Sequence, residues 1–309
     1  MTASVSTPAI DLHDVAKTYG KTTALEGLSL TVGRGELVGL LGPNGAGKTT
    51  TIKLLLGLVR PTAGSGQVLG APLGGRQARA AIGYLPELFR YQPWLHAREV
   101  LALHAELARV PTARRARSID DALALVGLVG RADDPVSAFS KGMQQRLGLG
   151  VALLGDPDLV LLDEPTSALD PVGRTDVRAI VRAARDRGAT VILNSHLLTE
   201  VERVCDRVII LDHGRIIASG SLDEVVASDG VRLRVTDLDD AGRAAAAAFG
   251  PVTLEGDWLS VRPLAAEKVP DLVAALVATG GRVHAVEPGR GSLEARFLEL
   301  LAASESAHS

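Results

Sequence analysis

Nine consecutive residues in the first fifth of the chain combine the groups needed to bind phosphate. A turn with three glycines lets backbone N–H groups approach phosphate oxygens, and a helix start adds its positive end. Lys48 would reach the outer phosphates, and the Thr49 hydroxyl would ligate Mg²⁺. An apolar run at 37–41 and a helical pattern at 48–56 flank the loop. This context makes a chance glycine-rich turn the weaker interpretation. The nine residues are Gly42, Pro43, Asn44, Gly45, Ala46, Gly47, Lys48, Thr49 and Thr50.

Two adjacent carboxylates, Asp163 and Glu164, follow an expected strand at 158–162, which is apolar after Asp158 and reads as a buried parallel strand. Ligands bind at this end of strands in open α/β sheets. Asp163 can hold Mg²⁺ directly or through water, and Glu164 can polarise an attacking water. A single carboxylate there is commonly a solvated loop end, but a pair in a chain with a phosphate loop favours chemistry.

His196 follows the next expected strand, at 190–193, and could hydrogen-bond a terminal phosphate in the same crevice. In isolation such a histidine is more often the neighbour of a helix cap. Tyr19 is one of nine aromatic residues. Its ring could stack on an adenine or pack against the sheet, and this stretch alone does not decide between the two.

Ser140 is a natural N-cap for a helix that we expect to continue to residue 154. The free backbone donors of that helix start could hold a phosphate from outside, although the pattern by itself shows only a capped helix. Three aromatic residues, Phe89, Tyr91 and Trp94, fall close together. They form either local core or an exposed docking patch.

The remaining pattern predicts the elements that position these residues. We expect strands at 9–15, 28–32, 67–70 and 81–85, a turn at 61–66, helices at 96–108, 112–125 and 171–187, and a hairpin formed by 206–211 and 215–219. After about residue 228 we expect strands at 231–235, 252–255, 259–261 and 282–286, helices at 241–249, 265–279 and 292–302, and a loose end at 304–309. The predicted domains are therefore 1–228, with a helical subdomain at about 88–150, and a small α/β unit at 229–309.

Composition narrows the function classes. The net charge of −3 lacks the basic footprint of a nucleic-acid partner, so none is expected. The single cysteine, Cys205, excludes a disulfide framework within the chain and offers no metal cluster. The first eight residues have no basic start or apolar run, so we expect no secretory signal. No stretch has the length and apolarity of a membrane span, so we expect a cytosolic chain, or one held at a membrane by partners.

Together these motifs resemble the nucleotide-binding subunit of an ABC transporter over about residues 8–225. The stretches 82–87 and 140–143 look like the exporter branch, whose members pump drugs, lipids or polymers. The resemblance implies an α/β P-loop NTPase core with an antiparallel β subdomain and a helical subdomain, followed by a small C-terminal α+β domain. The matching positions are the adenine-stacking Tyr19, the phosphate loop, Glu87 as a third Mg²⁺ ligand beside Thr49 and Asp163, the signature 140–146, the carboxylate pair, the dimer-contact Asp170 and the switch histidine His196.

The resemblance also implies partners. Two copies would form a head-to-tail homodimer with two ATP molecules at the interface. Each ATP would be held by the phosphate loop of one copy and by the signature of the other, through Ser140, Lys141, Gly142 and Gln144. The segment from Glu87 to Trp94 would dock a separate membrane-spanning permease, which gives Phe89, Tyr91 and Trp94 a docking role and places the subunit at the cytoplasmic face of the membrane.

Three positions depart from the family pattern. Lys141 and Met143 stand where the common signature has glycine and glutamine, and Glu87 stands at the usual glutamine. Lys141 changes the charge near the partner's ATP. Glu87 can still meet Mg²⁺ or its water, because that ion prefers hard oxygen ligands.

The sequence thus predicts an Mg²⁺-dependent ATPase that drives export. In this hypothesis Glu164 activates the hydrolytic water and His196 contacts the γ-phosphate. The rivals are an importer subunit and a soluble ABC-type ATPase of DNA repair or translation. The repair class usually has a long coiled coil before the signature and the translation class two cassettes, and neither feature occurs here.

Overall fold

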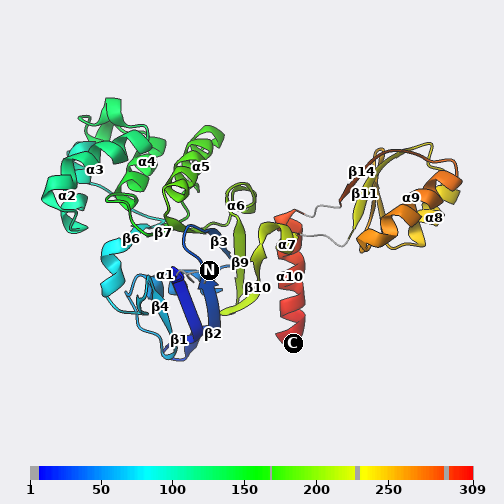
Figure 1. Cartoon of the computed structure of the whole chain (residues 1–309), viewed down its shortest axis with the longest axis horizontal. Coiled ribbons are helices and arrows are strands. Elements are labelled where there is room, and N and C mark those ends of the chain that lie inside the picture. The colour runs from blue at the N-terminus through cyan, green and yellow to red at the C-terminus, as the bar shows by residue number, and fades with distance from the viewer. Residues whose placement is uncertain (1–6, 168, 227–229, 289–291, 309) are drawn as a thin grey trace, which may run out of the picture. The chain divides into compact units, whose positions relative to one another are not determined.

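The computed structural model describes residues 7–167, 169–226, 230–288 and 292–308. The chain forms two compact units, which are described separately. The first comprises Met1–Leu222 together with Ser304–Ser309, and the second comprises Asp223–Ala303. The division after Leu222 lies a few residues before the boundary expected from the sequence. Figure 1 gives the order of the elements along the chain.

A six-stranded sheet forms the centre of the first unit, in the order β10-β9-β3-β8-β7-β6. Five strands are parallel, and β10 pairs antiparallel with β9. Strands β3, β7 and β8 are buried throughout, as parallel strands covered on both faces should be. The strands are β3 (Leu37–Leu41), β6 (Ile82–Leu85), β7 (Leu159–Asp163), β8 (Thr190–Asn194), β9 (Arg207–Asp212) and β10 (Arg215–Ser221).

A second, antiparallel sheet has the order β2-β1-β4-β5 and is built from β1 (Ile10–Tyr19), β2 (Thr22–Val32), β4 (Ala63–Val68) and β5 (Ala71–Pro72). The predicted turn at 61–66 is wrong from Ala63 onward. The segment Ala63–Val68 pairs with β1 despite its glycines. Glycine is required at position 66, since a Cβ there would lie 2.5 Å from the carbonyl oxygen of Asp11. Helix α1 (Lys48–Leu55) packs its buried side chains into the same core.

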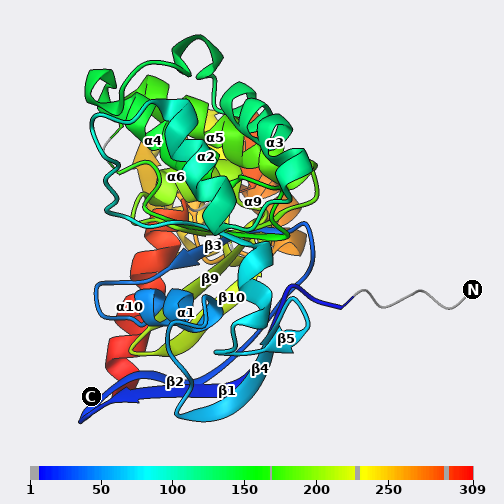
Figure 2. The same ribbon diagram turned by 90° about the vertical axis from the view of Figure 1, so that its left-hand side faces the viewer.

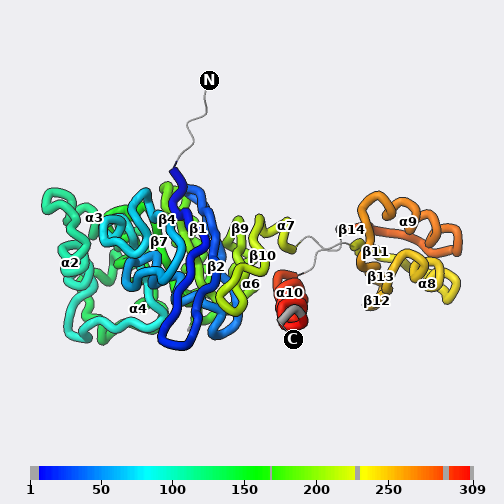
Figure 3. The backbone as a smooth tube through the Cα atoms, turned by 90° about the horizontal axis from the view of Figure 1, so that it is seen from below, coloured from blue at the N-terminus to red at the C-terminus, as the bar shows by residue number. Residues whose placement is uncertain are grey.

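Three helices form a layer of their own, shown in Figures 1 and 2 on the opposite side of β3 from the antiparallel sheet. They are α2 (Ala97–Leu107), α3 (Thr112–Leu125) and α4 (Lys141–Ala152), with short 3-10 turns η2 (Val129–Arg131) and η3 (Val136–Ala138) between the last two. Figure 3 shows the backbones of α2 and α3 beside each other. The Ser140 hydroxyl accepts a hydrogen bond from the N–H of Met143 at 3.2 Å, so the predicted N-cap of α4 is confirmed.

The rest of the first unit contains the expected helix after Asp170 and the expected hairpin, together with three short helical elements that were not predicted. Helix α5 (Pro171–Asp186) is capped by Asp170, α6 (Leu198–Val204) follows β8, and η1 (Gln77–Ala81) and α7 (Leu222–Val226) are short. The hairpin predicted around Asp212 is confirmed by the pairing of β9 with β10. Among the described residues, no helix is long and apolar enough to cross a membrane.

The second unit contains an antiparallel sheet of order β12-β13-β11-β14. Apolar side chains alternate along β11, and Leu233, Leu259 and Leu272 are fully buried in one core. Its elements are β11 (Val231–Thr236), α8 (Asp240–Ala247), β12 (Val252–Glu255), β13 (Trp258–Val261), η4 (Ala266–Lys268), α9 (Val269–Ala278), β14 (Arg282–Pro288) and the start of α10 (Leu293–His308). All four strands expected here are present.

The prediction of a loose end at 304–309 is wrong for the described part of that segment. Helix α10 continues to His308, and Ser304 is buried. Composition misled the prediction, because serine and alanine look like an unstructured tail unless a tertiary partner satisfies them.

Candidate functional site

The phosphate loop lies between β3 and α1, as the sequence predicts. Two of its glycines are required by contacts with protein backbone. A Cβ on Gly42 would lie 2.3 Å from the carbonyl oxygen of Leu211, and a Cβ on Gly47 would lie 2.7 Å from that of Ala24. Both residues also have positive φ, so side chains there would be strained as well as crowded. The remaining tip, at Asn44 and Gly45, is exposed and open to a ligand.

Lys48 is the cation of the loop. Its ammonium group donates hydrogen bonds to the carbonyl oxygens of Gly42 at 2.6 Å and Pro43 at 2.9 Å. Burial lowers the pKa of Lys48, and the negative charges of Glu164 and then Asp163 oppose that shift. The structure therefore brings the phosphate loop and both predicted carboxylates into one electrostatic neighbourhood.

Asp163 ends β7 and is buried. Its Oδ1 accepts a hydrogen bond of 2.5 Å from Nδ2 of Asn194, the last residue of β8. Nearby, the pKa of Tyr84 is raised, first by burial and then by the charges of Asp163 and Glu87. The charges of Asp163 and Glu87, predicted as Mg²⁺ ligands from distant parts of the sequence, thus both act on the phenol of Tyr84.

Glu164 is held in an unusual backbone conformation, with φ of 52°, and only 9% of its surface is exposed. Its Oε1 accepts a hydrogen bond of 2.9 Å from the backbone N–H of His196, and its Oε2 lies 2.7 Å from Nδ1 of the His196 ring. Left-handed backbone at a non-glycine residue costs about 1–3 kcal/mol and persists where the surroundings enforce it. The contacts with His196 fix the carboxylate at the carboxyl edge of the sheet.

The start of α4 and the loop before α5 line one hollow of about 390 Å³. Signature residues Ser140, Lys141 and Gly142 contribute one wall, and Asp170 contributes another. No residue of the phosphate loop lines this hollow, so the two predicted phosphate-binding surfaces are separate in one chain. Gln144, also predicted to meet ATP, is exposed and donates from Nε2 to the carbonyl oxygen of Phe139 at 3.2 Å. Asp170 itself accepts from the N–H of Gly173 at 2.7 Å.

Tyr19 ends β1 with 44% of its surface exposed. The Lys17 ammonium lies 4.9 Å from the centre of its ring, which places a cation over one face. Half exposure leaves ring surface on which a planar base can stack. The ring is therefore not packed fully on the sheet.

The aromatic segment after Glu87 is divided by the structure. Phe89 and Tyr91 are partly buried, with ring centres 5.4 Å apart, and Tyr91 also packs edge-on against His104 of α2. By contrast, Trp94 is 71% exposed, and Leu88 is 87% exposed. Tyr91 thus packs against the helical layer, whereas Trp94 and Leu88 leave apolar surface exposed.

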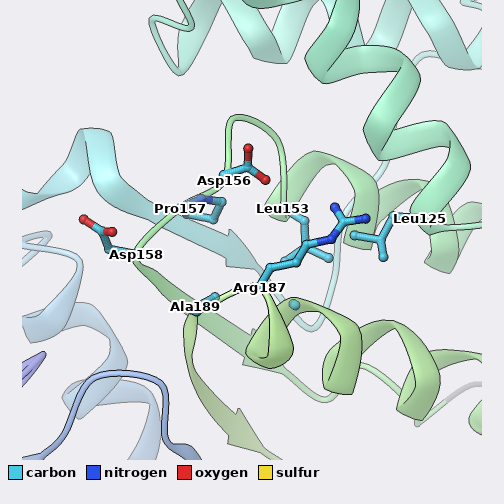
Figure 4. Close-up of a pocket in the computed structure, with 9 residues that line it drawn as sticks. Leu125, Leu153, Asp156, Pro157, Asp158, Arg187 and Ala189 are labelled. Atoms are coloured by element: carbon cyan, nitrogen blue, oxygen red, sulfur yellow. The ribbon is translucent and has the colours of Figure 1, made fainter.

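A small hollow of about 90 Å³ lies at the opposite edge of the sheet, near the starts of β7 and β8. Figure 4 shows the Arg187 side chain extending toward Leu125 across this hollow, with Asp156 and Asp158 at its other side. None of the predicted site residues lines it. Its volume is too small for a nucleotide, so it is not part of the candidate site.

Sequence reasoning missed two residues that belong to the site, Asn194 and Tyr84. Asn194 donates a hydrogen bond to Asp163, and the charges of Asp163 and Glu87 raise the pKa of Tyr84. Asn194 is a polar residue at the end of a buried strand, two positions before His196, and this pattern could have identified it. Nothing in the local sequence distinguishes Tyr84 from an ordinary strand tyrosine.

The donors at this edge suit Mg²⁺ bound together with nucleotide phosphates. Asp163 and Glu87 offer carboxylate oxygens and Thr49 a hydroxyl, and Mg²⁺ prefers hard oxygen ligands. Within the described ranges, no three His, Cys, Asp or Glu residues lie close enough to hold a metal by themselves. Such a partial set fits an ion whose shell is completed by phosphate oxygens and water.

Comparisons with known proteins agree with this site. A family model described as ABC transporter matches residues 25–167. The chain is 39% identical over 307 residues to an uncharacterized ABC transporter ATP-binding protein of Nostoc sp., covering 95% of this chain and 90% of the relative. It is 38% identical over 226 residues to the Nod factor export ATP-binding protein I of Ralstonia nicotianae, covering 72% and 70%.

A solved structure of the ATP-binding subunit of an ABC transporter superposes with a TM-score of 0.64 at 33% identity, covering 70% of this chain and 91% of that one. The predicted α/β P-loop ATPase fold is therefore confirmed. The chain belongs to the family of ABC transporter ATP-binding subunits, whose members bind and hydrolyse ATP.

Proposed function

We propose that this chain is the Mg²⁺-dependent ATPase subunit of an exporter and works as a head-to-tail homodimer with a membrane-spanning permease. The observation that carries the proposal is the pairing of Glu164 with His196 beside Asp163 and Lys48. In this proposal these groups act together at one edge of the sheet, Glu164 as base, Asp163 as metal ligand and Lys48 as phosphate ligand.

In the proposed reaction, Glu164 orients and polarises the attacking water, since its carboxylate is fixed in place by the N–H of His196. The His196 ring contacts the terminal phosphate, and Lys48 turns from the loop carbonyls to the outer phosphates. Asp163, Thr49 and Glu87 would hold Mg²⁺, and the ion would neutralise charge on the phosphates. Tyr19 stacks on the adenine.

The homodimer is supported by the separation of the two phosphate-binding surfaces. The hollow at Ser140, Lys141 and Gly142 is apart from the phosphate loop of its own chain. A second copy in head-to-tail orientation would bring its ATP to this hollow. Lys141 and the positive end of α4 would then lie close to the γ-phosphate of that ATP. Asp170, which lines the same hollow, would contact the other copy.

Docking to a permease is supported by the exposed Leu88 and Trp94, which directly follow Glu87. If Glu87 moves when the dimer closes, Leu88 and Trp94 would move with it, because they follow it directly in the chain. Export, rather than import, is supported by the similarity to the Nod factor export protein. In this proposal the permease holds the subunit at the inner face of the membrane, no nucleic acid takes part, and the 229–309 region is an accessory module.

Affinity purification from gently solubilised membranes tests the proposal. A tagged chain should co-purify with a hydrophobic protein of several spans in a stoichiometric ratio. Recovery with ribosomes or DNA-repair factors would instead favour the soluble class of ABC ATPase. Co-purification with a permease together with an external solute-binding protein would favour import. Trp94→Ala should reduce the permease yield, whereas Tyr91→Phe, at a partly buried ring, should not.

A further inference from the structure

The turn between β9 and β10 packs against the phosphate loop. The N–H of Gly214 donates to the carbonyl oxygen of Ala46 at 3.0 Å, and the carbonyl of Gly214 accepts from the N–H of Glu26 at 2.9 Å. Just before the turn, the carbonyl oxygen of Leu211 lies only 2.3 Å from the position that a Cβ on Gly42 would take. Because these are backbone contacts in tight packing, the turn and the loop cannot shift independently.

Asp212, at the start of this turn, is only 4% exposed, and a buried carboxylate needs hydrogen-bond donors. One donor is the hydroxyl of Ser304, whose Oγ lies 2.7 Å from Oδ2 of Asp212. Ser304 is itself 9% exposed and stands 92 positions further along the chain. The contact is therefore a buried long-range hydrogen bond within the first unit.

Ser304 belongs to α10, a single helix that begins at Leu293 in the second unit and ends in the first. The helix therefore continues from the second unit into the first, where its end meets the β9–β10 turn through this hydrogen bond. We propose that the Ser304–Asp212 hydrogen bond is a positioning contact through which the end of α10 sets the ATP affinity of the phosphate loop.

This inference rests on the proposed function only in assigning ATP to the loop. Its consequence is reciprocal. If docking of the helix end favours the ATP-bound loop, ATP must favour docking of the helix end by the same factor. Ser304 acts through Asp212 and the turn, and it has no role in the chemical step. Its removal should change ATP affinity and leave the turnover rate at saturating ATP unaltered.

The test measures Mg²⁺-ATP binding by calorimetry, and ATPase kinetics, on the full chain. Ser304→Ala should weaken ATP binding at least threefold without changing kcat, and Ser304→Thr, which keeps the hydroxyl, should restore much of the affinity. The matched control is Glu299→Gln on the same helix. Glu299 pairs with Arg296 at 3.1 Å on an exposed surface, so its loss should not alter ATP affinity.

Hydrogen exchange supplies the reciprocal measurement. ATP should slow exchange of the backbone amides at 304–308 in the wild-type chain, and this slowing should disappear in Ser304→Ala. Equal ATP affinity in wild type and Ser304→Ala, or exchange at 304–308 that ignores ATP, would overturn the inference and leave the transporter proposal intact. Loss of kcat with unchanged affinity would also overturn it, since that result would place Ser304 in catalysis.

Discussion

Nδ1 of His196 lies 2.7 Å from Oε2 of Glu164, and the backbone N–H of the same histidine donates to Oε1 of that carboxylate. His196, which follows β8, therefore fixes the side chain of Glu164, which follows the neighbouring strand β7. The pairing is possible because β7 and β8 are parallel and in register, with Asp163 opposite Asn194. The carboxylate is fixed before any substrate arrives, which is how a general base should be prepared.

The first prediction concerns this base. Glu164→Gln keeps the shape of the side chain and its acceptor oxygen for the His196 N–H, but it removes the basic carboxylate. ATP hydrolysis under saturating Mg²⁺ should fall by about 100-fold or more, in the range typical of a lost general base. ATP binding should remain. Phosphate-release kinetics combined with nucleotide binding separate the two effects, and hydrolysis at the wild-type rate would refute the role of Glu164.

Asn194 should contribute to stability as well as to the site. Asn194→Ala removes the amide that donates to the buried Asp163, and an unsatisfied buried acceptor costs about 1–3 kcal/mol. Urea unfolding should show a loss of that size, together with a higher Mg²⁺ requirement for hydrolysis. Gln92→Ala, at an exposed position, serves as the control and should match wild type in both measurements. A stable variant with normal Mg²⁺ dependence would show that Asn194 is dispensable.

The buried ammonium group of Lys48, which ATP binding requires, should destabilise the folded chain. Burial lowers its pKa below the ordinary value of 10.5, so the ammonium form is less favourable in the folded chain than in the unfolded one. The cost is present below the lowered pKa and vanishes as the pH rises past 10.5. Lys48→Met should therefore raise Tm at pH 7 while abolishing ATP binding. Thermal scans at increasing pH should show the Tm difference shrinking, and a lower Tm for the variant at pH 7 would contradict this prediction.

Cys205 should be unreactive in the native protein. The thiol is buried against the central sheet, and burial raises its pKa, so the reactive thiolate is scarce at neutral pH. Because it is the single cysteine, one labelling experiment reports on it alone. A thiol reagent should modify about one group per chain in denaturant and almost none in buffer. Rapid labelling of the native chain would show that α6 opens readily from the sheet.

Gly148 should be required for the contact between α4 and the aromatic segment. A Cβ there would lie 2.6 Å from the Phe89 ring and 2.8 Å from Leu85, so Gly148→Ala must displace one or both of these side chains. Overpacking of this kind costs about 1–3 kcal/mol. Gly130→Ala is the matched control, because a Cβ at Gly130 meets nothing within 4 Å. Chemical denaturation of both variants should separate the two cases, with only Gly148→Ala destabilised.

The sequence by itself determined the features that depend on short stretches. The strand at Leu37–Leu41, the helix from Lys48 and the strand at Leu159–Asp163 follow from local periodicity. Glycine spacing and a capping serine are equally local, so the phosphate loop and the start of α4 were predictable. The family could be inferred because several such signals occur in a fixed order.

Only the tertiary structure decided how distant residues meet. The approach of Asn194 to Asp163, the common neighbourhood of Glu87 and Asp163 at Tyr84, and the bond between Ser304 and Asp212 all depend on strand order and helix placement. It also separated Phe89 and Tyr91, which are partly buried, from the exposed Trp94. The physical reason is that burial and long-range hydrogen bonds are properties of packing between elements, and no local pattern records which elements will pack.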